Sequence, residues 1–132
     1  LNPLYFGSEI YEAEEQRKNS LLKNKNLYQV YKEITSKIKT SFFVFLVFGS
    51  FAKGTQGKNS DMDLMFISNE KDFEKKVHSI VSILPLDIHL LVFTESEFIS
   101  MKDSKKENVI KEALNNNIVL YGIQNFYNLK NA

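Results

Sequence analysis

Runs of apolar residues predict four strands in this chain. Residues 42–48 are all aromatic or aliphatic and end at Gly49, and a run of this length favours a strand buried on both faces. Residues 61–67 and 86–93 alternate between two sets of side chains, as the successive residues of a strand do. Residues 118–121 predict a short edge strand. We expect the first of these runs to form the central strand of a sheet.

Apolar residues at helical spacing predict helices around these strands. One amphipathic helix begins near Ser20, and a second is capped by Asn69 and ends before Pro85. Residues 94–97 match a capping box and predict a short helix, and residues 109–114 mark another. The apolar positions of the two longer helices are Leu27, Val30, Tyr31, Ile34 and Ile38 in the first, and Phe73, Val77, Ile80, Val81 and Leu84 in the second.

The order of the predicted elements indicates an α/β domain. Helices and strands are interspersed without an internal repeat, which favours a mixed β-sheet of about four strands with helices packed on it. A chain of 132 residues, 43% of them hydrophobic, is sized for one core. We therefore predict an N-terminal linker or surface helix, starting near Ser8, within residues 1–19, and one folded domain over residues 20–132.

Composition narrows the classes of function. The 17 basic residues nearly balance the 16 acidic ones, and the formal net charge of +1 gives no reason to expect the chain to wrap nucleic acid. The absence of cysteine excludes thiolate metal sites and suits a reducing compartment such as the cytoplasm. No apolar run approaches the length of about 20 residues that a membrane helix needs, so no membrane association is expected. Because the first residue is Leu1, we expect a processed chain or a piece of a longer protein.

The most informative pattern of functional residues begins directly after the predicted central strand and continues into the next two strands. Gly49 and Ser50 open a short helical turn, where unpaired backbone N–H groups let a phosphate approach. Asp61 and Asp63 are two residues apart in a predicted strand, so both carboxylates project from one face and can share a metal ion. Such oxygen ligands suit Mg²⁺ or Mn²⁺ together with substrate phosphates. Asp87 lies on the following strand, where it could complete the site or take a proton from an attacking hydroxyl.

Simpler interpretations of the same residues remain open. Asp61 alone is typical of a turn before a strand, and Asp87 alone is typical of a surface acid at a strand end. Lys53 could screen phosphate charge, although a loop lysine is usually only solubilising. His89 shares the predicted face of Asp87, and we interpret it as a packed or hydrogen-bonded histidine rather than a ligand. The pairing of Asp61 with Asp63 is what favours a functional site.

This segment resembles the minimal nucleotidyltransferases of the DNA polymerase beta superfamily. Their signature is Gly-Ser, ten residues, then Asp-x-Asp, and the chain has the same spacing from Gly49-Ser50 to Asp61-Met62-Asp63. The resemblance implies phosphate binding by Gly49, Ser50 and Lys53, and metal binding and catalysis by Asp61, Asp63 and Asp87. The cofactor would be Mg²⁺ or Mn²⁺, and the substrate would be a nucleoside triphosphate.

The resemblance also implies an activity and a kind of partner. The enzyme would transfer a nucleoside monophosphate, AMP from ATP, to an acceptor hydroxyl, and residues 20–132 would form the nucleotidyltransferase domain. Small members of the family commonly modify a protein such as a partner toxin, which implies an antitoxin-like role. The alternative is a non-catalytic nucleotide-binding or regulatory module of a winged-helix DNA-binding protein, because residues 1–3 resemble the end of such a domain. DNA would then be bound only through a domain upstream of Leu1.

Overall fold

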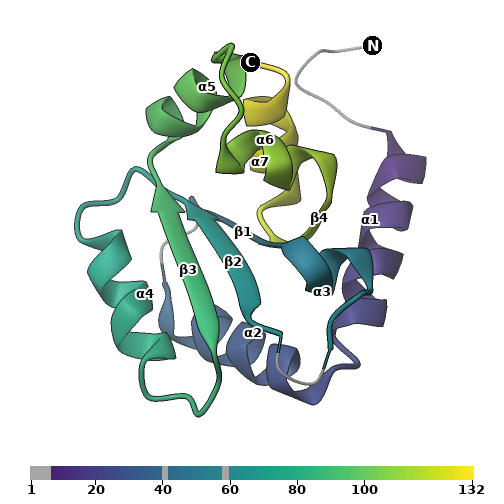
Figure 1. Cartoon of the computed structure of the whole chain (residues 1–132), viewed down its shortest axis with the longest axis vertical. Coiled ribbons are helices and arrows are strands. Elements are labelled where there is room, and N and C mark those ends of the chain that lie inside the picture. The colour runs from purple at the N-terminus through teal and green to yellow at the C-terminus, as the bar shows by residue number, and fades with distance from the viewer. Residues whose placement is uncertain (1–6, 40–41, 58–59) are drawn as a thin grey trace.

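Four strands form one mixed sheet at the centre of the molecule. A computed structural model of the chain describes residues 7–39, 42–57 and 60–132, and its strands lie in the order β3-β2-β1-β4. Figure 1 shows the sheet with helices on both faces. β1 (Val44–Phe48) pairs antiparallel with β2 (Met62–Ile67) and with β4 (Asn117–Tyr121), whereas β2 pairs parallel with β3 (Ile88–Phe93). The predicted α/β fold with a mixed sheet of about four strands is confirmed.

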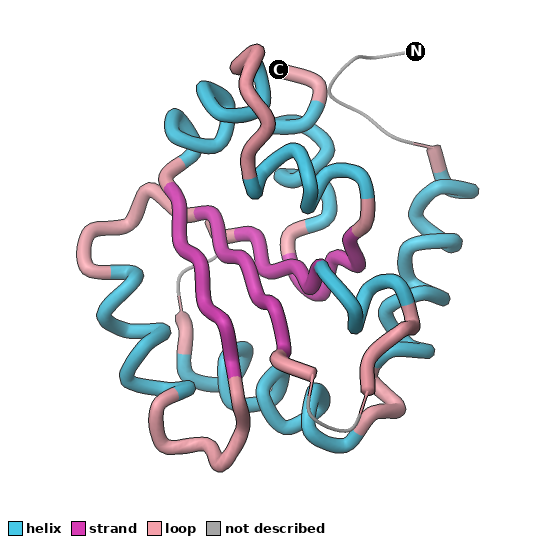
Figure 2. The backbone as a smooth tube through the Cα atoms, viewed as in Figure 1, coloured by secondary structure: helices cyan, strands magenta, loops and turns pink. Residues whose placement is uncertain are grey.

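Each strand predicted from the sequence is present, with its start displaced by one or two residues. β1 is an interior strand, as expected, and β4 lies at an edge. The described residues also contain seven helices, which Figure 2 shows in cyan. They are α1 (Ser8–Leu21), α2 (Lys25–Lys37), α3 (Gly49–Lys53), α4 (Phe73–Val81), α5 (Glu95–Asp103), α6 (Val109–Asn115) and α7 (Ile123–Lys130).

β1 separates two hydrophobic clusters. Its side chains alternate, so Phe45 and Val47 join one cluster with α2 and α4, whereas Leu46 and Phe48 join the other with α5, α6 and α7. Every residue of β1 is buried, which confirms the prediction of a strand buried on both faces. Both faces of β1 are buried, so packing holds the strand in place. Gly49, which follows directly after β1, is therefore held at the edge of the core.

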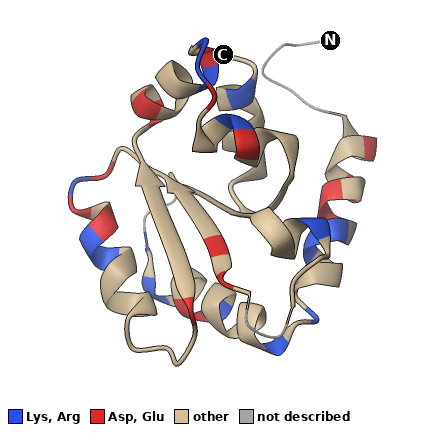
Figure 3. Ribbon diagram, in the orientation of Figure 1, with Lys and Arg blue, Asp and Glu red and all other residues tan. Residues whose placement is uncertain are grey.

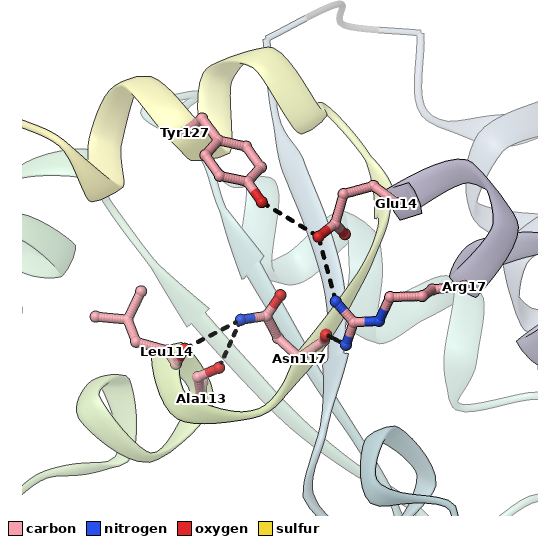
Figure 4. Close-up of polar contacts among 6 residues, drawn as sticks. All are labelled: Glu14, Arg17, Ala113, Leu114, Asn117 and Tyr127. Atoms are coloured by element: carbon pink, nitrogen blue, oxygen red, sulfur yellow. Dashed lines mark hydrogen bonds and ion pairs between the residues drawn. The ribbon is translucent and has the colours of Figure 1, made fainter. Parts of the chain in front are cut away.

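α1 is attached to the sheet by polar contacts, which Figure 4 shows. No residue of this helix is buried. The Oε1 of Glu14 accepts hydrogen bonds from the Tyr127 hydroxyl of α7 and from Arg17 Nη1, each at 3.2 Å. Arg17 Nη2 also donates to the backbone carbonyl of Asn117 in β4. The predicted boundary between residues 19 and 20 falls within α1, and the division of the chain at that point stays a prediction.

The start of α4 differs from the sequence prediction. Asn69 does not cap this helix, which begins at Phe73 after Asp72 in the N-cap position. Asn69 Oδ1 instead accepts a hydrogen bond from the backbone N–H of Glu95 at 2.9 Å, at the start of α5. Asn69 follows β2, and Glu95 follows the parallel neighbour β3. The pairing of these two strands therefore brings Asn69 to the start of α5. The capping box at Thr94 is confirmed, with both of its reciprocal bonds present.

One helix was not predicted from the sequence. α7 follows β4 after Gly122, whose φ of +80° lies in the left-handed region that favours glycine. Phe126 and Leu129 are buried and three residues apart, which is the spacing of a helix face, although the segment is too short for the pattern to stand out. None of the helices in the described part of the chain is long and apolar enough to cross a membrane.

Candidate functional site

Gly49 brings the turn after β1 into contact with Asp63 of β2. Gly49 has a φ of +69°, and a Cβ at this position would overlap Asp63 Oδ2 and lie 3.1 Å from Asp63 Cγ. The contact follows from the sheet, because Phe48 pairs with Asp63 across the antiparallel ladder. Glycine is therefore required twice here, by the backbone conformation and by the close carboxylate. The predicted helical turn is present as α3, which begins at Gly49.

Asp63 and His89 form a side-chain contact between β2 and β3. The two residues pair in the parallel register of β2 and β3, and His89 Nδ1 lies 2.9 Å from Asp63 Oδ1. The Asp63 side chain is 24% exposed and the His89 side chain is 55% exposed, so the pair faces solvent. His89 is thus hydrogen-bonded, which is one of the two roles that we expected. The alternation of residues in the sequence predicted that His89 lies on the same face of its strand as Asp87. The pairing of His89 with Asp63 depends on the register between β2 and β3, which no local sequence pattern indicates.

Asp61 and Asp87 lie at the starts of the two parallel strands. Each immediately precedes its strand, both are exposed, and the backbone N–H of Met62 donates to the carbonyl of Asp87 at 2.9 Å. Because Met62 pairs with Ile88, the two aspartates occupy neighbouring positions at one end of the sheet. Figure 3 shows acidic residues in this part of β2 and β3.

The three aspartates do not form a closed group of ligands. Across residues 7–39, 42–57 and 60–132, no three carboxylate or imidazole groups are gathered in a way that could hold a metal ion. The structure brings Asp63 together with Gly49 and His89, and it places Asp61 beside Asp87 along the strand ends. The predicted sharing of a metal ion by the aspartates therefore stays a prediction.

Ser50 and Lys53 belong to α3. Ser50 is half-buried, and its carbonyl accepts the backbone N–H of Thr55 at 2.9 Å, which closes the turn after the helix. Lys53 is exposed and is the last residue of the helix, three positions after Ser50. Residues at this spacing share a helix face. Lys53 is thus placed on the side of α3 that carries Ser50.

Two cavities adjoin this region. One, of about 280 Å³, is lined by residues that include Ser60, Met62 and Asp87. The other, of about 780 Å³, lies between α1 and α3 and is lined by residues that include Arg17 and Lys53. Neither cavity was predicted, because each is formed by segments that are distant in the sequence.

Comparison with known proteins identifies the fold. Residues 31–125 match the family described as polymerase beta, nucleotidyltransferase. The chain belongs to this nucleotidyltransferase family. The match begins within α2 and ends within α7, so it contains the sheet, α3 and all three aspartates, while α1 lies outside it. The resemblance inferred from Gly49-Ser50 and Asp61-Met62-Asp63 is thereby confirmed.

A solved structure of low sequence identity has a similar fold. It is described as "Crystal structure of the toxin-antitoxin with AMP-PNP". The superposition has a TM-score of 0.51 at 18% sequence identity, and it covers 79% of this chain and 82% of the other. At this identity the likeness shows the fold alone. Among curated proteins, no match to this nucleotidyltransferase was found.

Proposed function

We propose that this nucleotidyltransferase domain transfers AMP from ATP to an acceptor hydroxyl. The observation that carries the proposal is the contact between Gly49 and Asp63, which joins a phosphate-accepting turn to a carboxylate without an intervening side chain. Ser50 and Lys53, on one face of α3, supply further groups for the phosphates. This arrangement suits a substrate that presents both phosphate oxygens and a metal ion.

The donor set fits a divalent cation bound together with its substrate. Asp63 is the second residue of β2, Asp61 immediately precedes this strand, and Asp87 immediately precedes its parallel neighbour β3. Mg²⁺ and Mn²⁺ take oxygen ligands and are commonly held by one or two carboxylates plus substrate phosphates. We propose that Asp61, Asp63 and Asp87 hold this cation, which would neutralise triphosphate charge.

The transfer step uses the exposed aspartate at the start of β3 as a base. The acceptor hydroxyl oxygen attacks the α-phosphorus, and the bond from that phosphorus to the oxygen bridging to the β-phosphate breaks. Pyrophosphate leaves, and the hydroxyl proton passes to the carboxylate of Asp87. Gly49, Ser50 and Lys53 position the phosphates for in-line attack.

We propose a protein as the acceptor. Asp61, Asp87 and His89 are exposed, so the acceptor side of the site has room for a macromolecule. The structural relative is a toxin–antitoxin with AMP-PNP, which supports a partner toxin as the acceptor and an antitoxin-like role for this chain. Contact with DNA through a domain upstream of Leu1 stays a prediction.

The second candidate is a non-catalytic nucleotide-binding module. It is favoured by the dispersion of Asp61, Asp63 and Asp87, which do not form a closed three-ligand group among the described residues. Such a module would bind ATP at Gly49 and Ser50 without transferring any part of it.

A labelling experiment separates the two candidates. The chain is incubated with ATP labelled on its α-phosphate, Mg²⁺ and a lysate of the source cells, in parallel with the Asp61→Asn/Asp63→Asn double variant. The matched control is Asp103→Asn, whose side chain is 63% exposed on α5. We expect labelled acceptor with the wild type and the control but not with the double variant. Equal labelling by all three proteins would refute catalysis at this site.

A further inference from the structure

Asp63 is the only one of the three site aspartates whose carboxylate is held by another side chain within the described residues. Its Oδ1 lies 2.9 Å from His89 Nδ1. The carboxylates of Asp61 and Asp87 take part in no hydrogen bond or ion pair across residues 7–39, 42–57 and 60–132. A side chain that is already held in one orientation loses less freedom when a ligand binds to it. Asp63 is therefore prepared for a ligand in a way that the other two aspartates are not.

The two carboxylate oxygens of Asp63 have different neighbours. Oδ1 contacts the imidazole of His89, whereas Oδ2 is the atom that a Cβ at Gly49 would overlap. Oδ2 takes part in no hydrogen bond in the part of the chain that the structure describes. Because a carboxylate only accepts hydrogen bonds, His89 Nδ1 is the donor to Oδ1. The imidazole thus occupies one oxygen and leaves the other beside the turn that begins at Gly49.

The contact between His89 and Asp63 contributes little to folding. Both side chains face solvent, where an ion pair or hydrogen bond between side chains adds little to stability. β2 and β3 are joined by their backbone ladder over six residue pairs, so their pairing does not depend on this contact. Removal of the imidazole should therefore leave the fold intact, and its effect should appear at Asp63.

We propose that His89 is a positioning residue of the active site, which holds Asp63 Oδ1 so that Oδ2 stays beside Gly49 and free for a divalent cation. This inference rests on the proposed function for the role of Asp63 as a cation ligand. His89 acts through Asp63 and itself touches neither cation nor substrate. Loss of its Nδ1 donor lets the carboxylate rotate, so more cation is needed to fill the site.

The test measures how much Mn²⁺ the full chain needs in order to bind AMP-PNP, by calorimetry at fixed ionic strength. The variants are His89→Ala, His89→Asn, His89→Gln and His78→Ala. The amide nitrogen of asparagine is as many bonds from the backbone as Nδ1 is, so His89→Asn keeps a donor for Asp63. The longer glutamine places its nitrogen where Nε2 stands, and His89→Gln loses this donor. His78→Ala removes an exposed histidine from α4 and is the matched control.

The three substitutions of His89 should separate by the position of the donor. We expect His89→Ala and His89→Gln to raise the Mn²⁺ concentration for half-maximal AMP-PNP binding about tenfold, a usual effect of losing a residue that orients a metal ligand. His89→Asn should raise it less than about threefold, and His78→Ala less than about twofold, because both keep a donor to Asp63. The midpoints of urea unfolding should be nearly equal in all five proteins.

Three results would overturn the inference. They are an unchanged Mn²⁺ requirement in His89→Ala, equal effects of His89→Asn and His89→Gln, and a large fall in the unfolding midpoint of His89→Ala. If the wild type shows no Mn²⁺-dependent binding of AMP-PNP, both this inference and the proposed cation site are wrong. The transfer assay is read separately. A Mn²⁺ requirement that depends on His89 in a chain that labels no acceptor would refute the transfer but keep this inference.

Discussion

Among single residues, Gly49 has the most demanding position in the candidate site. Its backbone is left-handed, and the absence of a side chain lets the Asp63 carboxylate lie against the turn. Gly54, at the other end of α3, has a similar φ of +74° but has nothing within 4 Å of the place where a Cβ would stand. Substitutions at both glycines carry the free-energy cost of a left-handed backbone. Only a substitution at Gly49 also carries the cost of a steric clash with Asp63.

We predict that Gly49→Ala destabilises the protein more than Gly54→Ala does. A left-handed alanine costs about 1–2 kcal/mol at either position, and only at Gly49 must Asp63 also move. AMP-PNP affinity should fall in Gly49→Ala and stay nearly unchanged in Gly54→Ala. Urea unfolding and calorimetry measure the two effects. Equal unfolding free energies and equal affinities would show that the contact with Asp63 has no role.

At the scale of elements, two attachments matter most for the site: β1 within the sheet and α1 on its edge. Leu46 is fully buried in β1, three residues before Gly49, and packs with α5, α6 and α7. α1 is held by hydrogen bonds of Glu14, Arg17 and the Tyr127 hydroxyl, and its last residue, Leu21, packs against the core cluster of α2 and α4. The first attachment is apolar and insensitive to pH, and the second is partly polar.

Truncation of β1 should be costly. Leu46→Ala leaves a cavity in a fully buried position, and we expect it to lower the free energy of unfolding by about 2–5 kcal/mol. Ile83→Ala, at a side chain that is 71% exposed, should cost less than about 0.5 kcal/mol. Thermal or urea unfolding measures both, and similar costs would contradict the assignment of β1 as the centre of the core.

The contact between α1 and α7 should weaken at high pH. Burial raises the pKa of Tyr127 above its ordinary value of 10.0, and the charge and hydrogen bond of Glu14 raise the pKa further. The folded state then keeps a proton that the unfolded state loses, so this stabilisation is complete below pH 10.0 and decreases as the pH rises through the folded pKa. The unfolding free energy of the wild type should therefore fall more steeply above pH 10.0 than that of Tyr127→Phe. Parallel profiles for the two proteins would contradict this role of the hydroxyl.

At the scale of the whole molecule, the sequence predicts the sheet better than it predicts the contacts between elements. The apolar run of β1 and the alternation of β2 and β3 are local patterns, and they suffice to predict the strands and to place His89 on the same face as Asp87. The contact between Asp63 and His89 needs the parallel register, and the cavity beside Lys53 needs α1 to lie against β4. Arg17 and Asn117 are 100 residues apart, and no local signal links them.

The whole chain consists of a nucleotidyltransferase core and an attached helix. Residues 31–125 carry the family match, and α1 with its following turn completes a cavity on the side of α3. The core accounts for the proposed transfer.

The central claim is that this domain transfers the nucleoside monophosphate part of ATP. The most direct measurement compares ATP labelled on the α-phosphate with ATP labelled on the γ-phosphate, using the same chain, Mg²⁺ and source lysate. We predict that the α-label appears on an acceptor, that the γ-label is released as pyrophosphate, and that the Asp61→Asn/Asp63→Asn variant abolishes both. Transfer of the γ-label to the acceptor, or no release of pyrophosphate from either substrate, would contradict the account.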